Sequence, residues 1–554
     1  MSRRLLSSAV CLALTCTPSP SLAAAPSSSQ VDAIFKDYAR KDSPGCALAV
    51  IRDGRIVYSK GYGMASLEHG VPISPTTVFD IGSTSKQITA ASILLLAADG
   101  RLSLDDDVRK YVPEVPDYGT KVTINHLLHH TSGLRDYSNL MFFAGFDLAD
   151  VTKDNDGLAA IARQKNLNFP PGSEHSYSNT GYFLMSRIVQ KVSGKSLRDF
   201  AQERIFTPLG MTSTQFLNDH QLVIPHRATA YTPGMEGGFV VEMSNWEQMG
   251  DGGVQTTVED LAKWDQNFYT PKLGGARLIE ELQTVGTLND GKKLTYARGL
   301  QVGPYRGLRR VSHGGGWAGY RAELMRFPDQ KLSTVVLCNL GSTNPSGLAQ
   351  SVADLYLGDQ LQAETRPLPA AKPEAPPATP PVPTASIVGL YWSPSAGFLR
   401  RIHDNGGKLL YDRGQGNESE LAASGGNRFE MVGAPIPTQV VFLASGQMEV
   451  ASAGIDPIVF QKVEPANLKP EDLGAYVGSY WSEETDTAYD VVTEGDRLIV
   501  HRKRGPVYPL EPAFVDAFNS PGGLLHFTRN PQNKIDGFLT SAGSARNLRF
   551  DKKP

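Results

Sequence analysis

A proline-rich segment divides this chain of 554 residues into two regions that we expect to fold separately. Eight of the 19 residues between Pro367 and Ala385 are proline. Such a segment is extended and semi-rigid and cannot join a packed core. We therefore predict a linker at 366–385, with an N-terminal domain at 24–365 before it.

The region after the linker contains an internal repeat with a constant offset of 89 residues. The matching positions are Val388–Ser393 with Val477–Ser482, Gly406 with Gly495, Leu409 with Leu498, and Ser452–Gly454 with Ser541–Gly543. One offset shared by four separate matches indicates a duplicated unit. Each copy has short alternating runs broken by Gly, Asn and Asp. This pattern predicts two small antiparallel, lipocalin-like β-barrels, at 386–465 and 466–554.

The N-terminal domain shows strand patterns at both ends and helical patterns between them. Cys46 to Ile51 is an apolar run followed by a hairpin signal at Asp53-Gly54, and strand patterns return at Arg321 to Phe327. The segment from Ser83 to Ala98 has a helical pattern. Strands at both ends predict a single sheet in which segments far apart in the sequence pair with each other, in a domain of the α+β class.

The first 23 residues have the pattern of a secretion signal. Arg3 and Arg4 precede the apolar run from Leu5 to Leu14, and a small-residue cleavage site ends at Ala23. We therefore expect an exported protein, periplasmic or secreted. No later apolar run is long enough for a membrane span, so we expect none after signal removal.

The net charge limits the possible partners, and the cysteine content leaves one possible disulfide in the mature chain. The net charge of −3 becomes −5 once the two arginines of the signal are removed, which argues against nucleic acid as a partner. Of the four cysteines, Cys46 and Cys338 remain in the mature chain, either as a disulfide or as two buried thiols. The oligomeric state is left open.

Ser83 and Lys86 are the first candidates for catalysis. Three residues apart at the start of a predicted helix, they share one face. A serine hydroxyl needs a base within hydrogen-bond reach, and a lysine amine can serve if desolvation lowers its pKa. Ser-x-x-Lys alone is a weak signal, because it occurs by chance about once or twice in a chain this long.

Two later segments supply complementary chemistry. A phenol such as Tyr177 can relay a proton, and the amide of Asn179 can orient a lysine or bind a substrate carbonyl. The segment His313-Gly314-Gly315-Gly316 lets a substrate backbone approach closely. A free N–H there, together with that of Ser83, could form an oxyanion hole.

In this order the three motifs resemble those of the penicillin-recognising serine hydrolases. The flanking segments agree with the branch that contains class C β-lactamases, DD-peptidases, esterases and D-aminopeptidase; they are Phe79–Gly82, Leu127–Leu134, Pro208–Met211, Gly252–Val254 and Asp260–Trp264. The resemblance covers about residues 30–360. It implies a β-lactamase/transpeptidase-like domain with an antiparallel sheet and a helical subdomain. The domain plan with two barrels is most similar to that of D-aminopeptidase.

The resemblance also implies roles for individual residues. Ser83 would be the acylated nucleophile, and Lys86 and Tyr177 would share the general-base role. The residues expected to bind or orient the substrate are Asn179, His313, Gly315 and Gly316, with the backbone N–H groups of Ser83 and Gly316 holding the oxyanion. Class C β-lactamases carry lysine where this chain has His313, and histidine is only partly charged near neutrality, which argues against efficient β-lactam hydrolysis.

The expected activity is acyl transfer to water on a small-molecule or peptide substrate. Our first interpretation is a peptidase acting on small or D-amino-acid-containing peptides. The alternatives are an esterase or weak β-lactamase of the same family, or a penicillin-binding sensor without turnover. The chemistry requires no metal or organic cofactor, and the spacing of His126, His129 and His130 is better explained by loop packing than by zinc. The resemblance to D-aminopeptidase implies that one barrel sends a loop toward the active site. The sequence leaves open which loop does so: Phe514–Gly523 is one candidate, and an acidic residue in it such as Asp516 could bind a substrate amine if it reached the site.

Overall fold

The computed structural model describes residues 26–362, 383–414, 417–432, 434, 438–452 and 457–554. The signal predicted at 1–23 lies outside the described residues, as do the repeat positions Ala453 and Gly454 and all but the last three residues of the predicted linker. Within the described part of the chain, none of the helices combines the length and the apolar character needed to cross a bilayer.

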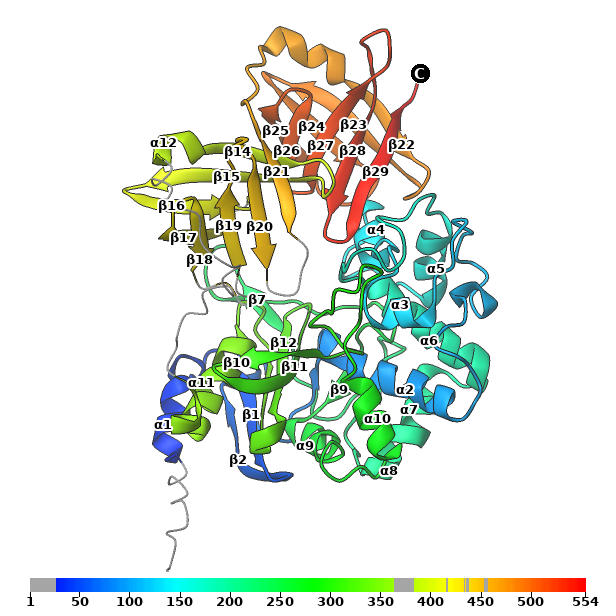
Figure 1. Cartoon of the computed structure of the whole chain (residues 1–554), viewed down its shortest axis with the longest axis vertical. Coiled ribbons are helices and arrows are strands. Elements are labelled where there is room, and N and C mark those ends of the chain that lie inside the picture. Colours follow the sequence, from blue (N-terminus) through cyan, green and yellow to red (C-terminus); the bar gives the residue numbers. More distant parts are fainter. Residues whose placement is uncertain (1–25, 363–382, 415–416, 433, 435–437, 453–456) are drawn as a thin grey trace, which may run out of the picture.

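The N-terminal domain is built around a six-stranded antiparallel sheet with the order β10-β11-β12-β13-β1-β2 (Figure 1). The strands are β1 (Cys46–Arg52), β2 (Arg55–Tyr62), β10 (Gln301–Tyr305), β11 (Leu308–Trp317), β12 (Tyr320–Phe327) and β13 (Leu332–Cys338). β1 and β13 are apolar and almost wholly buried, because helices cover both faces of the sheet. Strands from the two ends of the domain thus close one sheet, as the sequence predicts.

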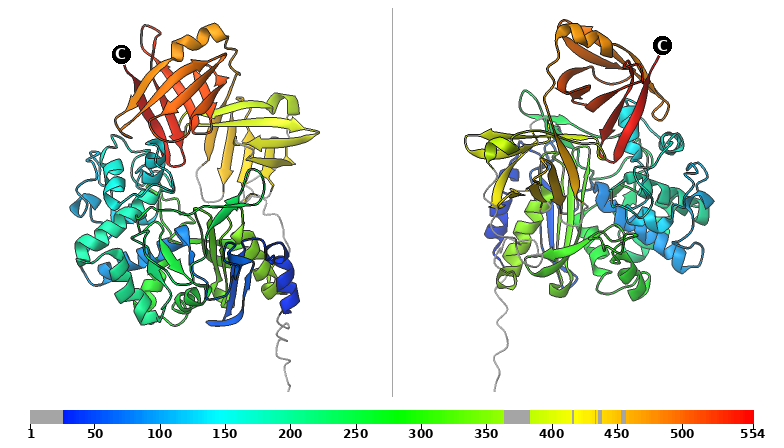
Figure 2. Two further views of the ribbon diagram at one scale, coloured as in Figure 1. Left: turned by 180° about the vertical axis from the view of Figure 1, so that it is seen from behind. Right: turned by 45° about the horizontal axis from the view of Figure 1, so that its top comes forward.

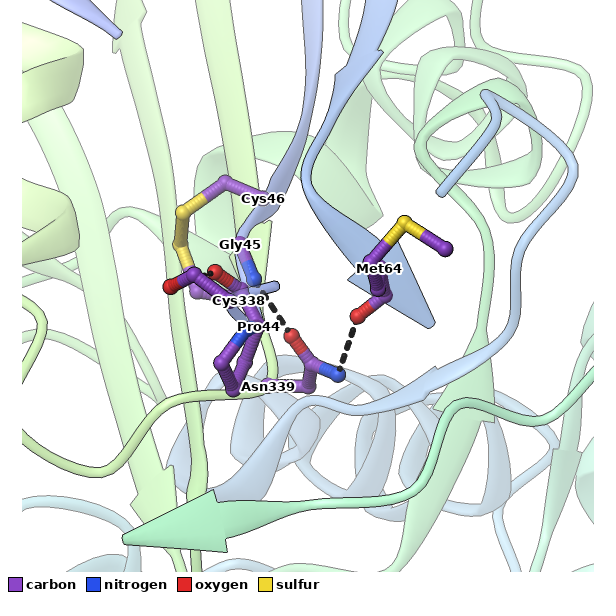
Figure 3. The surroundings of a disulfide bond; sticks show 7 residues. Pro44, Gly45, Cys46, Met64, Cys338 and Asn339 are labelled. Carbon is purple, nitrogen blue, oxygen red and sulfur yellow. Dashed lines mark hydrogen bonds between the residues drawn. A yellow bond between two sulfur atoms is a disulfide. The ribbon is translucent and has the colours of Figure 1, made fainter. Parts of the chain in front are cut away.

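Cys46 and Cys338 face each other across the β1–β13 pair and form a disulfide (Figure 3). The sequence left this pairing open. Beside it, the side-chain oxygen of Asn339 accepts a hydrogen bond from the Gly45 amide at 2.9 Å, and its side-chain nitrogen donates to the Met64 carbonyl at 3.0 Å. The disulfide and the asparagine together fix the end of the sheet where the two halves of the domain meet.

Helices form a layer on each face of this sheet. α1 and α11 cover one face, where Val31 and Val352 join apolar residues of β1 and β13. α2 and α9 belong to the larger core on the other face. The helices are α1 (Ser28–Ile34), α2 (Lys86–Ala98), α3 (Ile124–Leu128), α4 (Tyr137–Phe143), α5 (Asp154–Ala162), α6 (Asn179–Ser193), α7 (Leu197–Ala201), α8 (Thr207–Leu209), α9 (Val258–Gln266), α10 (Gly275–Leu282), α11 (Pro345–Leu357) and α12 (Thr384–Ile387).

α2 runs through the interior of the domain. Every residue from Lys86 to Leu96 is buried, as expected for a helix that is apolar on all sides. The sequence predicts a helix from Ser83, whereas the structure has a 3-10 turn, η2 (Gly82–Ser85), that runs into α2 at Lys86. Gly82 enters this turn with a φ of +47°, which glycine adopts without strain.

Short strands border this core. They are β3 (Met64–Ser66) with β4 (Val71–Pro72), β5 (Phe79–Asp80) with β9 (Val254–Thr256) and β6 (Gln215–Phe216), and β7 (Tyr231–Pro233) with β8 (Phe239–Val241). β5 leads directly into η2, and its partner β9 follows the loop that contains Asp251. These small sheets therefore hold two loops of the later site next to each other.

The region after the linker forms two closed eight-stranded antiparallel barrels, as the sequence predicts. Barrel 1 comprises β14 (Gly389–Ser393), β15 (Phe398–Asn405), β16 (Lys408–Asp412), β17 (Glu418–Gly425), β18 (Arg428–Met431), β19 (Thr438–Phe442), β20 (Met448–Ser452) and β21 (Ile458–Val463). Barrel 2 comprises β22 (Gly478–Ser482), β23 (Thr487–Glu494), β24 (Arg497–Arg502), β25 (Tyr508–Phe514), β26 (Ala517–Ser520), β27 (Gly523–Arg529), β28 (Ile535–Ala542) and β29 (Ala545–Lys552).

The two barrels share details that follow from the duplication. The buried Tyr391 donates a hydrogen bond from its hydroxyl to a carbonyl four residues earlier, at 2.9 Å, and Tyr480 does the same at 2.6 Å. Both barrels lie on the same side of the N-terminal domain, barrel 2 over α4 and barrel 1 over β7 and β10 (Figures 1 and 2). The two barrels contact each other where Trp392 of barrel 1 packs against Phe514 and His526 of barrel 2.

Candidate active site

Ser83 lies in η2, and the turn that holds it is fixed by a buried carboxylate. One oxygen of Asp80 accepts a hydrogen bond from the Gly82 amide at 2.7 Å, and the other accepts from the Gln255 side chain at 2.6 Å. The Ser85 hydroxyl accepts from the Val254 amide at 3.1 Å. β9 therefore locks the turn from one side and leaves Ser83 facing the cavities described below.

Lys86 projects from the first turn of α2 into a fully buried position. Its Nζ lies 3.0 Å from Ser83 Oγ, 2.8 Å from Asn179 Oδ1 and 2.6 Å from the carbonyl oxygen of Asp251. Burial lowers the pKa of Lys86 from 10.5 to about 8, and the nearby carboxyls of Asp251 and Asp136 oppose this shift. A neutral amine can direct its two N–H bonds at the two carbonyl oxygens and keep its lone pair for the Ser83 proton.

Tyr177 lies beside this amine, with its ring centroid 4.9 Å from Lys86 Nζ. Its hydroxyl is buried and makes no hydrogen bond of normal geometry to any described residue. Burial raises the pKa of Tyr177 well above 10, and the nearby Ser83 hydroxyl opposes the shift. Tyr177 is therefore a neutral phenol whose proton is available to a bound molecule.

Asn179 owes its position to the start of α6. Its backbone amide donates to Asp136 at 2.6 Å, and the same carboxyl group caps α4 by accepting from the Asn139 amide at 3.0 Å. The N-termini of α4 and α6 thus meet at one carboxylate. Its negative charge interacts favourably with the positive ends of both helix dipoles. This arrangement directs the Asn179 side chain toward Lys86.

Asp136 and Asp251 were missed in the sequence. Asp251 is buried next to Lys86, and its carboxyl group accepts a hydrogen bond from the Tyr137 hydroxyl at 3.2 Å. Burial raises the pKa of Asp251, and the charge of Lys86 opposes the rise. Asp136 precedes an apolar run, which is the signal of a helix cap, so its position alone could have been predicted.

His313 is buried in β11 and uncharged. Its Nδ1 faces the Gly314 carbonyl at 2.6 Å and so carries the proton, which leaves Nε2 to accept from the Tyr296 hydroxyl at 2.9 Å. Burial lowers the pKa of His313 to about 4, and the charge of Lys86 acts in the same direction. Tyr296, which fixes this orientation, carries no sequence signal that identifies it.

The glycines of β11 allow it to lie directly against η2. A Cβ atom on Gly315 would lie 1.9 Å from the Ile81 carbonyl oxygen, and one on Gly82 would lie 2.7 Å from the Gly316 nitrogen. The Thr84 hydroxyl ties the two segments together by donating to the His313 carbonyl at 3.1 Å. The backbones next to Ser83 and at Gly316 therefore adjoin, as an oxyanion hole requires.

The three histidines with helical spacing have separate partners. His126 accepts from the Thr123 amide at 3.3 Å as part of a helix cap, and His129 lies between backbone carbonyls. His130 accepts from the Ser178 amide at 3.1 Å, and its ring packs against Tyr177 with centroids 4.1 Å apart. In the part of the chain that the structure describes, these side chains do not form a metal-binding cluster.

The sequence profile of the Beta-lactamase family matches residues 31–358. This chain belongs to that family. D-aminopeptidase from Brucella melitensis biotype 1 is 26% identical over 537 residues, covering 94% of this chain and 98% of the relative. Penicillin-binding protein 4* from Bacillus subtilis is 32% identical over 326 residues, covering 55% of this chain and 70% of the relative. The octameric penicillin-binding protein homologue from Pyrococcus abyssi shares the fold, with a TM-score of 0.56, 23% identity, and coverage of 78% of this chain and 99% of that one. The family match and the two relatives with matching sequences support a serine hydrolase of the β-lactamase family.

Ser83 lies between two cavities. The smaller, of about 60 Å³, is lined by Asn179, Asp251 and Gly316 among others. The larger, of about 840 Å³, is open to solvent; it is lined by Tyr177 and His313 and, on one side, by strands β18, β19 and β20 of barrel 1. The first barrel therefore contributes a wall of the site in this member of the family.

Barrel 2 contacts the site through the turn between β28 and β29. The Ser544 hydroxyl donates to the Tyr177 carbonyl, and the Ser544 amide donates to Asn139 at 3.1 Å. The Ser544 carbonyl accepts from the Asp136 amide at 3.1 Å and from the Asn168 side chain at 2.8 Å. This turn thus bonds to the backbone that carries Tyr177 and to the loop that carries Asp136.

The candidate loop from the sequence, Phe514–Gly523, does not make these contacts with the site. Asp516 accepts hydrogen bonds from Arg529 at 2.7 Å and Tyr476 at 2.8 Å within barrel 2, and Phe514 packs on barrel 1. A basic partner on the neighbouring strand satisfies the carboxylate there. Asp516 is therefore not the barrel residue that contacts the site, and the β28–β29 turn lies there instead.

We expect Ser544→Ala to lower kcat on an amino-acid p-nitroanilide about fivefold, because losing this partly buried hydrogen bond loosens the Tyr177 backbone. A p-nitrophenyl ester should be affected much less, since nitrophenolate leaves without a proton whereas an aniline nitrogen needs one. Steady-state kinetics on both substrates measure the difference.

Ser445→Ala, in an exposed turn of barrel 1, is the matched control and should change neither rate. Equal losses on the two substrates would contradict a specific effect on Tyr177.

Proposed function

We propose that this protein is a peptidase that acts on small or D-amino-acid-containing peptides through an acyl-enzyme on Ser83. The observation that carries the proposal is the buried Lys86 amine at 3.0 Å from Ser83 Oγ, with a pKa lowered by desolvation. The relative from Brucella melitensis that bears the name D-aminopeptidase matches 94% of this chain, both barrels included. This match favours a peptidase over the other activities of the family.

In the proposed acylation, neutral Lys86 takes the proton of Ser83 while Oγ attacks the substrate carbonyl. The backbone amides of Ser83 and Gly316 stabilise the negative charge on the carbonyl oxygen. Collapse of the tetrahedral intermediate breaks the C–N bond, and the nitrogen receives the hydroxyl proton of Tyr177. The Lys86 ammonium then returns a proton to the Tyr177 oxygen, so both groups end as they began.

Deacylation repeats these steps with water as the nucleophile. Water attacks the acyl carbonyl while its proton passes to the Lys86–Tyr177 pair, and Ser83 Oγ leaves with the proton that this pair returns. Asn179 keeps Lys86 in place throughout, because its carbonyl oxygen accepts from Nζ at 2.8 Å. The free acid and the regenerated enzyme complete the cycle.

The state of His313 argues against an efficient β-lactamase. A β-lactam carries a carboxylate that a fixed positive charge would attract, and the position that is lysine in class C β-lactamases is here a neutral imidazole. Its two nitrogens are already engaged by Gly314 and Tyr296. Esterase activity on small activated esters remains compatible with the same site.

We expect a fluorophosphonate probe to label the wild-type protein and not Ser83→Ala, since Oγ is the proposed nucleophile. Ser83→Ala should also lower peptidase activity by more than about a thousandfold. Turnover of D-alanine p-nitroanilide should exceed that of the L isomer and of nitrocefin in the same assay.

The control is folding of Ser83→Ala, checked by circular dichroism. Preference for nitrocefin, or a penicilloyl adduct that persists in intact-mass spectra without turnover, would overturn the peptidase assignment.

We expect kcat/KM to rise with pH and to level off above about pH 8. The amine must be neutral to accept the Ser83 proton, and burial lowers its pKa from 10.5 to about 8. Below that pH the protonated fraction of Lys86 grows and the rate falls. A profile that stays flat from pH 6 to 10 would contradict the assignment of Lys86 as base.

We also propose that the protein is exported, with cleavage after Ala23. The disulfide between Cys46 and Cys338 supports this, since such bonds persist mainly in oxidising compartments. Expression of the full chain in a secreting bacterium should give an extracytoplasmic protein that begins at Ala24, with an intact mass lower by two hydrogens than after reduction. An uncleaved protein with free thiols in the cytoplasm would contradict the proposal.

A further inference from the structure

Glu323 is a buried carboxylate in the larger cavity that the proposed mechanism does not use. Its side chain belongs to β12, it is 4% exposed, and it faces Gly314 across the β11–β12 pair. A Cβ atom on Gly314 would lie 3.0 Å from Glu323 Oε2. The absence of a side chain at position 314 therefore leaves the carboxylate room to meet a molecule lying along β11.

The charge of Glu323 is incompletely compensated. The Ser346 hydroxyl donates to Oε2 at 2.6 Å, and no basic side chain of the described ranges lies within ion-pair distance. Arg310 lines the same cavity, but its guanidinium lies over the Tyr305 ring, 5.6 Å from the centroid. Burial raises the pKa of Glu323 to about 7, which the positive charge of Arg310 opposes. A cation that enters the cavity would therefore gain a buried, charge-assisted partner.

In the proposed mechanism, the two cavities receive different halves of the substrate. Tyr177 lines the larger cavity, whereas Asn179 lines the smaller one, and Ser83 and Gly316 line both. The leaving nitrogen must lie next to the group that protonates it, which is Tyr177 in the proposed mechanism. The leaving half thus extends into the cavity of about 840 Å³, and the acyl half occupies the cavity of about 60 Å³.

We propose that Glu323 binds a cationic group, an ammonium or guanidinium, on the leaving half of the substrate. This inference rests on the proposed function, and it specifies that function further. The preferred peptides would carry a small first residue and a basic residue, such as lysine, directly after the cleaved bond. Glu323 is then a specificity-determining residue and takes no part in proton transfer.

The test compares D-alanyl-lysinamide with D-alanyl-norleucinamide, which differ in the side-chain ammonium. At pH 8, where Glu323 is mostly ionised and the lysine ammonium is still charged, the wild-type enzyme should show a kcat/KM about tenfold higher for the lysine peptide. This is the size expected for a hydrogen bond to a charged group. In Glu323→Gln the ratio should fall to about one, with the norleucine rate changed less than about twofold. Glu280→Gln, an exposed change of the same kind on α10, should leave the ratio as in the wild type.

Absence of a lysine preference in the wild type would overturn the inference, as would an unchanged preference in Glu323→Gln. If Glu323→Gln fails to fold or to react with a fluorophosphonate, product inhibition of the wild type decides. Lysinamide should then inhibit about tenfold more strongly than norleucinamide. Equal inhibition by the two amides would also overturn the inference.

A second pair of substrates separates this inference from the peptidase assignment. Acetylthiocholine and its uncharged isostere, S-(3,3-dimethylbutyl) thioacetate, differ only in the charge of the leaving half. If D-peptides are not cleaved but the thioesters are, the proposed peptidase function fails. A preference for acetylthiocholine that Glu323→Gln removes would still support the cation site, and equal rates would overturn it.

Discussion

The burial of the Lys86 amine is the constraint on which the rest of the site depends. An ammonium without solvent is costly unless hydrogen-bond acceptors surround it, and here they come from η2, the start of α6 and the loop before β9. These segments are far apart in the sequence, so only the completed fold supplies them together. The same burial that demands the acceptors lowers the pKa of the amine and makes it a base near neutral pH.

The large sheet helps to bring these segments together, because it pairs strands from both ends of the domain. The pairing of β1 with β13, held by the disulfide between Cys46 and Cys338, fixes β12 and β11 in turn. β11 can then lie against η2 only because Gly315 has no side chain. The geometry around Ser83 therefore depends on backbone packing as much as on the catalytic side chains.

The sequence predicted the parts of this structure that depend on local spacing or on repetition. Ser83 and Lys86 share a turn, and the offset between the barrels is visible because the duplication kept its length. Tyr296, Ser544 and Glu323 could not be found this way, since each acts through a contact that tertiary packing creates. Asp516 was a wrong candidate for a related reason: the pairing of its carboxylate with Arg529, on another strand, is apparent only in the folded barrel.

The two barrels share one fold but contribute to the site in different ways. Barrel 1 presents strands β18 to β20 to the larger cavity and limits what can occupy it. Barrel 2 inserts the turn with Ser544 behind Tyr177, and a buried ion pair between Arg135 and Glu484 holds it there. A buried pair of this kind tolerates little movement, because separating the partners leaves an uncompensated charge. One barrel thus borders the cavity next to Ser83, the proposed nucleophile, while the other holds the backbone of Tyr177, the proposed proton donor. In the proposed mechanism, a change in either barrel would alter catalysis without touching the three motifs.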